Sequence, residues 1–234
     1  MDMTIEILIG SRTILINPTV VTGFLIAILL SGIMIIAGNA VKKADPTKAS
    51  KGWVLFLELV VTTVESLVKA TMGAHNLNFA PFVGTLIFFI FTANIIGLLG
   101  FSPPTSDFNV TVALAAFTMV MMYKQGIKSE GPWKTFMGTV FGDYPALMPL
   151  NVIGALAQPI SLSVRLFGNM MSGTILLGLV YTALGWVTPV IAPFLHVYFD
   201  IFSGVVQTLI FIMLTMIWTE GMTTNKSESQ IRGN

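Results

Sequence analysis

Long apolar stretches without a charged side chain recur along this sequence. They run from Thr19 to Val41, within Ala70 to Ser106, from Tyr144 to Val164 and on both sides of Asp200, and a marginal one lies between Asp107 and Lys124. A helix needs roughly 20 apolar residues to cross a bilayer, because each residue adds about 1.5 Å along its axis. When the sequence is divided at residues typical of turns, the pattern predicts five crossings, near 19–41, 81–100, 109–125, 146–184 and 190–220.

Residues 53–72 show a different pattern, with helical spacing and two unlike faces. The apolar positions are Trp53, Phe56, Leu57, Val60, Val64, Leu67 and Val68. Glu58, Glu65 and Lys69 fall mostly on the opposite side, which predicts an amphipathic helix lying on the membrane surface. The alternative is a sixth crossing, which the charges oppose at about 2.5–3.5 kcal/mol for each central Asp, Lys or Arg.

The last two predicted helices are longer than a perpendicular crossing requires. At about 1.5 Å per residue, 146–184 would extend about 58 Å and 190–220 about 46 Å, against a hydrocarbon core of about 30 Å. We therefore expect a long, strongly tilted hairpin, with bends allowed at Pro149 and Pro159. The pattern shows no internal repeat, so the expected fold is all-α, a polytopic membrane protein with a single membrane domain over residues 1–234.

Composition narrows the possible functions. Hydrophobic residues make up 54% of the chain, charged residues 10%, and the mean hydropathy is +0.84, which excludes an ordinary water-soluble enzyme. The near balance of 12 Lys and Arg against 11 Asp and Glu removes the basic excess that nucleic-acid binding needs. Because the chain has no cysteine, disulfides, iron–sulfur clusters and thiolate metal sites are excluded, and we expect neither a cofactor nor a bound metal.

The distribution of positive charge predicts the orientation in the membrane. One side of the five crossings receives ten cations: Lys42, Lys43, Lys48, Lys51, Lys69, Lys124, Lys128, Lys134, Lys226 and Arg232. The opposite side receives only Arg12. By the positive-inside rule, the N-terminus faces outward and the C-terminus faces the cytoplasm. The segment before Thr19 has no basic start and no small-residue cleavage site, so we expect no removable signal peptide.

The twelfth cation, Arg165, belongs to neither side and lies in the middle of a predicted crossing. At 100° per residue, four polar side chains fall within about 40° of it on the helix: Gln158, Ser161, Asn169 and Ser172. One interpretation is structural, with Arg165 snorkelling or held in a static ion pair. The other is functional, because intramembrane ionisable groups usually mark ion pathways.

A second polar stripe is predicted on the following helix. His196, Asp200, Ser203 and Gln207 fall within about 60° of arc, and Thr174 on the preceding helix supplies another hydroxyl. Asp200 is the only carboxylate inside the predicted hairpin, so it either pairs with Arg165 or serves as an isolated, water-accessible acid. His196 is either a proton relay or an interfacial cap.

The predicted outward loop at 102–107 carries a further acid. Asp107 stands just before a crossing, where it suits either a helix N-cap or the mouth of an aqueous entry, and Asn94 would contribute deeper in the membrane. The sequence leaves both interpretations open.

Several blocks of this chain resemble one family of membrane proteins. Residues 159–170 read PISLSVRLFGNM, preceded by FAPF at 79–82 and NIIGL at 94–98 and followed by QTLIF at 207–211. This order resembles subunit a of bacterial F-type ATP synthases, and the resemblance extends from the first crossing to Glu220.

The resemblance implies a stator that faces a rotating ring of c subunits and carries two offset half-channels for H⁺ or Na⁺. Arg165 would be the stator arginine that discharges the ring carboxylates, with Asn169 and Gln207 as polar positions near it and Asp107 near the outward opening. It also implies a non-catalytic subunit of a bacterial cell membrane, with a b-subunit peripheral stalk and other synthase subunits as partners. ATP chemistry would lie on those other subunits.

Three positions depart from the pattern of this family. Many members have Glu nine residues after the arginine, where this chain has Thr174. This chain instead has Asp200, seven residues before Gln207, so the acid has moved to the following helix. Asn151 occupies the position fourteen before the arginine where some members carry Glu, which leaves the inner route without an acid.

Other membrane functions fit the residues less well. A voltage sensor needs repeated Arg on one helix, a secondary transporter two related halves, and an intramembrane protease a Ser–His or Asp–Asp pair. The remaining alternative is a stand-alone ion channel or transporter subunit that uses the same polar hairpin. Conduction by the isolated protein would distinguish it.

Overall fold

The computed structural model describes residues 5–9, 12–43, 52–142 and 145–223. Within these ranges the chain is helical apart from one short antiparallel hairpin, β1 (Ile5–Ile9) and β2 (Arg12–Ile16), which the apolar pattern did not predict. Four of the cations used above for orientation, Lys48, Lys51, Lys226 and Arg232, lie outside the described residues.

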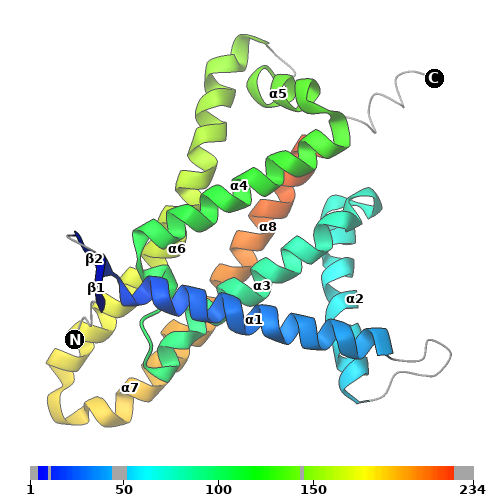
Figure 1. Cartoon of the computed structure of the whole chain (residues 1–234). Coiled ribbons are helices and arrows are strands. Elements are labelled where there is room, and N and C mark those ends of the chain that lie inside the picture. The colour runs from blue at the N-terminus through cyan, green and yellow to red at the C-terminus, as the bar shows by residue number, and fades with distance from the viewer. Residues whose placement is uncertain (1–4, 10–11, 44–51, 143–144, 224–234) are drawn as a thin grey trace, which may run out of the picture.

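Eight α-helices form the body of the described chain (Figure 1). They are α1 (Pro18–Lys43), α2 (Trp53–Met72), α3 (Ala80–Ile95), α4 (Phe108–Glu130), α5 (Pro132–Val140), α6 (Met148–Leu184), α7 (Thr188–His196) and α8 (Ser203–Thr223). Short 3₁₀ turns join them: η1 (Ala74–Phe79), η2 (Ile96–Leu99), η3 (Pro104–Ser106), η4 (Pro145–Leu147) and η5 (Gly185–Val187). A π-helical segment, η6 (Val197–Phe202), connects α7 to α8.

Four helical stretches are long and apolar enough to cross a membrane. They are Pro18–Lys42, Ala74–Leu99, Phe108–Glu130 and the 76-residue stretch Met148–Thr223, which contains α6, α7 and α8. The last stretch reverses direction at η5 (Figure 1), and its two crossings as the expected hairpin stay a prediction. The helix α2 does not qualify as a span, and its predicted position on the membrane surface stays a prediction.

Between the predicted crossings 109–125 and 146–184 we expected a loop over 125–143, but the described residues 125–142 are mostly helical. The helix α4 continues to Glu130, because charged side chains at the end of an apolar helix project into water without ending the helix. Gly131 stops it with φ 88°, and Pro132 at the first position starts α5. The helix α5 then packs back against α4 and α6.

The predicted single helix 190–220 is also wrong in detail. The chain forms α7, then the wider π-helical turn at 197–202, and then α8. Residues 185–189, expected to be a loop, are instead the tight turn η5 and the start of α7. Gly185, at φ 47°, supplies the backbone conformation that ends α6.

The buried core lies where α3, α4, α6 and α8 meet. Its side chains include Val83, Ile90, Ala115, Leu166 and Phe211. Small residues bring the backbones close together: a Cβ added to Gly204 on α8 would meet Cβ of Asn94 on α3 at 3.1 Å. Close approach of this kind is how helices associate inside membranes, where burial of apolar surface provides little drive.

A buried amide joins η1, α4 and α8. The side-chain Nδ2 of Asn76 donates to Oγ1 of Thr223 at 2.9 Å and to the carbonyl of Met72 at 3.0 Å, and its Oδ1 accepts from Nε2 of Gln125 at 3.0 Å. Because Asn76 is only 1% exposed, water cannot replace these bonds.

Replacing Asn76 by leucine should therefore weaken the fold. The change leaves Nε2 of Gln125 without its acceptor and Thr223 with only its bond to the carbonyl of Glu220, at a cost of about 1–3 kcal/mol. We expect a lower midpoint for heat-induced loss of the assembled protein in detergent. Asn78→Leu is the matched control, because Asn78 lies exposed on the same turn. Equal midpoints for the two variants would contradict the structural role of Asn76.

Candidate functional site

Arg165 lies on α6 at the edge between its packed and its exposed face. Leu162 and Leu166 are buried against the core, whereas Ser161 and Val164 are exposed, and Arg165 is half-buried between them. Among the described residues, Arg165 forms no ion pair and no hydrogen bond. A cation in an apolar helix needs a partner or water, and the described part of this chain supplies no partner.

An amide pair connects α6 to α8 one turn away from Arg165. Nδ2 of Asn169 donates to Oε1 of Gln207, and Asn169 follows Arg165 by four residues, on the same side of α6. Gln207 is 3% exposed, and its Nε2 is buried without a partner in the described chain. The sequence placed these two amides near Arg165 on separate helices, and the structure bonds them to each other.

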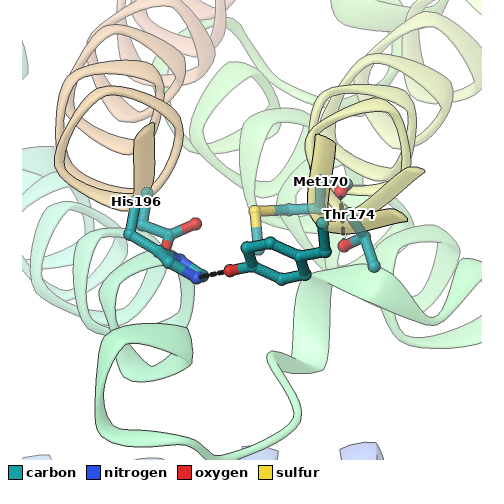
Figure 2. Close-up of polar contacts among 5 residues, drawn as sticks. Met170, Thr174 and His196 are labelled. Carbon is teal, nitrogen blue, oxygen red and sulfur yellow. Dashed lines mark hydrogen bonds and ion pairs between the residues drawn. The ribbon is translucent and has the colours of Figure 1, made fainter. Parts of the chain in front are cut away.

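Asp200 and His196 form the second polar cluster. Nδ1 of His196 lies 2.7 Å from Oδ2 of Asp200, and Nε2 of His196 contacts the hydroxyl of Tyr181 on α6 (Figure 2). An ionised carboxylate only accepts, so in the neutral imidazole Nδ1 carries the proton and Nε2 accepts from Tyr181. The three groups therefore form a continuous hydrogen-bonded chain from α6 to the π-helical segment.

The partner of Asp200 is thus His196 rather than Arg165. An Arg165–Asp200 salt bridge, one interpretation of the sequence, is absent from the described structure. The side chain of Asp200 is 14% exposed and that of His196 is 36% exposed, so the cluster is open toward its surroundings at the histidine.

The π-helical segment determines how Asp200 is presented. In η6 the backbone turn is wider than in an α-helix, so the arc of about 60° calculated for His196 to Gln207 does not apply across it. Single π-helical turns occur frequently at functional sites, because they redirect one side chain without ending the helix.

Tyr181 is the member of this cluster that sequence reasoning missed. Counted along a regular helix, it lies about 160° from Arg165, well away from the polar stripe. It reaches His196 only because η5 turns the chain back, so that α7 runs beside the end of α6 (Figure 1). A helical wheel of one segment contains no signal for such a contact.

Thr174 and Ser161 have few contacts of their own. Oγ1 of Thr174 donates to the carbonyl of Met170 at 3.0 Å, which satisfies the hydroxyl within α6. Figure 2 shows Met170 pointing from α6 toward the helix that carries His196, while Thr174 lies to the other side. Ser161 is exposed on α6. Roles for both hydroxyls in an ion pathway stay predictions.

Asp107 caps α4 and also connects it to α1. Its Oδ1 accepts from the backbone N–H of Asn109 at 2.9 Å, as expected of an N-cap. Its Oδ2 accepts from Nδ2 of Asn17 at 2.7 Å and from Oγ1 of Thr19 at 3.1 Å. Asp107 therefore fastens the starts of two helices, whatever further role it has at an aqueous opening.

Asn94 is also held in the interior. Its Oδ1 accepts from Oγ1 of Thr105 at 3.0 Å, and its Nδ2 lies 3.5 Å from the carbonyl of Gly204. At 1% exposure it joins α3 to η3 and α8. No group of three or more His, Cys, Asp or Glu suited to a metal ion occurs in the described ranges.

Comparisons with known proteins agree with the resemblance seen in the motifs. The sequence model of the ATP synthase A chain family matches residues 20–220. ATP synthase subunit a of Trichlorobacter lovleyi is 35% identical over 208 residues, covering 88% of this chain and 86% of that protein. Subunit a of Geobacter sulfurreducens is 34% identical over 201 residues, covering 85% and 84%. The sodium ion specific subunit a of Propionigenium modestum is 36% identical over 183 residues, covering 71% of this chain but 62% of that protein.

Proposed function

Because the chain belongs to the ATP synthase A chain family, we propose that Arg165 is the stator residue at which this subunit discharges ring carboxylates as an ion crosses the membrane. The chain is a multi-pass membrane protein of the synthase's ion-translocating sector, and its partners are other synthase subunits. ATP is made and hydrolysed on those other subunits, so this chain is not itself an enzyme.

The unpaired guanidinium of Arg165 is the observation that carries this proposal. A half-buried cation on an apolar helix, with no carboxylate partner in the described chain, is suited to a carboxylate on another chain. Arginine keeps its charge even when partly buried, so it stabilises the ionised form of a ring carboxylate and promotes release of the ion. The same fixed charge repels cations and blocks leakage between the two half-channels.

The exposed side of α6 beside Arg165 suits a second helix at close range. Ser161, Gly168 and Ser172 lie there, and a Cβ added to Gly168 would meet nothing within 4 Å in this chain. Small side chains let two membrane helices approach closely. We assign this surface, the Ser161–Ser172 side of α6, to the c-subunit ring, and the b-subunit peripheral stalk to other surfaces.

The outer half-channel follows the polar groups on the η5 side of Arg165. The chain from Tyr181 through His196 to Asp200 can pass a proton, and the Asn169–Gln207 pair lies between it and Arg165. Asp107, Asn94 and Thr174 remain candidates along this side, and Ser161, one turn before Arg165, is a candidate on the other side of the arginine. The transported ion is H⁺ or Na⁺, and one of the relatives is named for sodium specificity.

The proposed orientation puts β1–β2 and η5 outside and the ends of α1, α4 and α8 toward the cytoplasm. In Figure 1 these two sets lie on opposite sides of the bundle. This orientation puts five cations with described side chains on the cytoplasmic side, and all five are exposed: Lys42, Lys69, Lys124, Lys128 and Lys134. Five crossings, with α2 on the membrane surface and α6–α8 as the hairpin facing the ring, complete this arrangement.

Co-purification with a c-subunit ring tests the proposed function. We expect the chain to hold the ring in mild detergent and to conduct no ions by itself in liposomes. Gly168→Leu should fold normally but lose the ring, because leucine fills the approach surface, whereas Gly38→Leu, at an equally open glycine on α1, should keep it. Normal conduction by the isolated chain would instead identify a stand-alone channel.

A further inference from the structure

A cavity lies at the end of the bundle opposite the Tyr181–His196–Asp200 cluster. It is lined by α4, α5, α6 and α8 and has a volume of about 450 Å³, room for several water molecules. Its lining includes Glu130, Lys134, Asn151, Ala155, Gln158 and Trp218. We refer to it as the α5 cavity, because α5, which the sequence did not predict, forms one wall.

Two of the polar side chains that line the α5 cavity have a buried oxygen without a donor. Oε1 of Glu130 and Oε1 of Gln158 are both buried and accept no hydrogen bond within the described chain. The described chain contains one other buried polar atom without a partner, Nε2 of Gln207, whose side-chain oxygen accepts from Asn169 one turn from Arg165. Buried acceptors of this kind need a donor or a cation, so the α5 cavity is suited to water and positive ions rather than to lipid or anions.

A backbone carbonyl adds a third acceptor to the same wall. Pro159 lies inside α6 and has no N–H, so the carbonyl of Ala155, four residues earlier, lacks its helical hydrogen bond. Ala155 lines the α5 cavity. A carbonyl that the proline leaves without its helical donor is free to bind water or a cation.

The α5 cavity is aligned with Arg165 along α6. Gln158 and Asn151 precede Arg165 by two and four helical turns, and both fall within about 40° of it around the helix axis. Two turns correspond to about 10 Å along the helix. A polar path therefore leads from Arg165 past Gln158 into the cavity, on the side away from Asp200.

We propose that the α5 cavity is the water-filled inner vestibule of the ion pathway and that Glu130 is its acceptor carboxylate. The inference rests on the proposed function and names the inner route, where the sequence offered only Asn151. A monovalent cation, H⁺ or Na⁺, released at Arg165 passes Gln158, binds at Glu130 and leaves to the cytoplasm. Lys134 lines the same cavity but forms no ion pair with Glu130 in the described structure, so the carboxylate stays available to the cation.

Cysteine reactivity tests whether the α5 cavity holds water. The chain contains no cysteine, so a single introduced thiol in it can be followed by the mass of the labelled subunit. Gly154 lines the cavity, and a Cβ there meets nothing within 4 Å, whereas its neighbour Ile153 is 64% exposed and lies outside the cavity lining. Only a hydrated thiol ionises and reacts quickly.

In the assembled synthase, Gly154→Cys should react with a cationic methanethiosulfonate added on the cytoplasmic side at least tenfold faster than Ile153→Cys. Ag⁺ should label it as well. Equal, slow reaction of the two thiols would overturn the proposal that the α5 cavity is a water-filled vestibule.

Pumping by Glu130 variants tests the carboxylate itself. Glu130→Gln should lower ATP-driven ion pumping about tenfold with the ring still bound, and Glu130→Asp should recover part of it. Glu65→Gln, at an exposed glutamate on α2, should leave pumping unchanged. Full pumping by an assembled Glu130→Gln synthase would overturn the role of Glu130. If Arg165→Ala abolishes pumping while Glu130→Gln pumps fully, the proposed function stands and only this inference fails.

Discussion

Replacing Arg165 by alanine is expected to abolish ATP-driven ion pumping and coupled ATP synthesis while the soluble sector still hydrolyses ATP. The reason is electrostatic. A unit-charge pair 4 Å apart at an effective dielectric of about 20 is worth about 4 kcal/mol, which corresponds to roughly a thousandfold in an equilibrium constant. Without the cation, a ring carboxylate arriving at the stator keeps its ion, and rotation no longer transports charge.

Fluorescence quenching of a pH- or sodium-sensitive dye in inverted vesicles measures the pumping. ATP hydrolysis by the detached soluble sector of the same preparation is the internal control, since Arg165 is remote from it. Arg165→Lys should also lose most pumping, because a partly buried lysine gives up its charge readily and lacks the planar guanidinium. Pumping retained by Arg165→Ala would refute the assigned role.

Asp200→Asn should produce the second-largest effect, a fall of about tenfold in ion flux with the complex still assembled. The amide keeps the size of the side chain, and its oxygen can still accept from Nδ1 of His196, so the π-helical segment should keep its shape. What is lost is the group that binds and releases the ion.

Passive ion flux through the membrane sector, with the soluble sector removed, isolates this step from ATP chemistry. Tyr181→Phe should show a smaller decrease, because it removes only the hydroxyl that contacts His196. Thr182→Val is the matched control, since the Thr182 hydroxyl is exposed and bonds only the carbonyl of Leu179. Unchanged flux in an assembled Asp200→Asn complex would remove Asp200 from the pathway.

The two polar stripes show how far periodicity leads and where it ends. The stripe around Arg165 lies on one uninterrupted helix, α6, so counting at 100° per residue placed Asn169 beside the arginine. The stripe from His196 to Gln207 crosses the π-helical turn at 197–202, where that count does not hold. A helical wheel assumes one uniform helix and cannot register a local change in winding.

The contacts that build the candidate site could not be predicted from the sequence, for a related reason. Tyr181 meets His196 only after the reversal at η5, and Glu130 shares a cavity with Gln158 only because Gly131 and Pro132 redirect the chain into α5. The Asp107 cap was a local prediction and is present, but its bonds to Asn17 and Thr19 join elements 90 and 88 residues apart in the chain.

The sequence by itself determined that this chain has helices apolar enough to span a membrane, and it singled out Arg165 as the one cation remote from both predicted faces. Both conclusions follow from the cost of placing charge in hydrocarbon, which acts on each residue separately and is therefore visible along the chain. The tertiary structure alone decided which polar groups meet: Asn169 with Gln207, Tyr181 with His196, and Glu130 with Gln158 around one cavity. These pairings depend on the angles at which turns, a proline and a π-helical segment direct the helices, and no periodicity in the sequence encodes them.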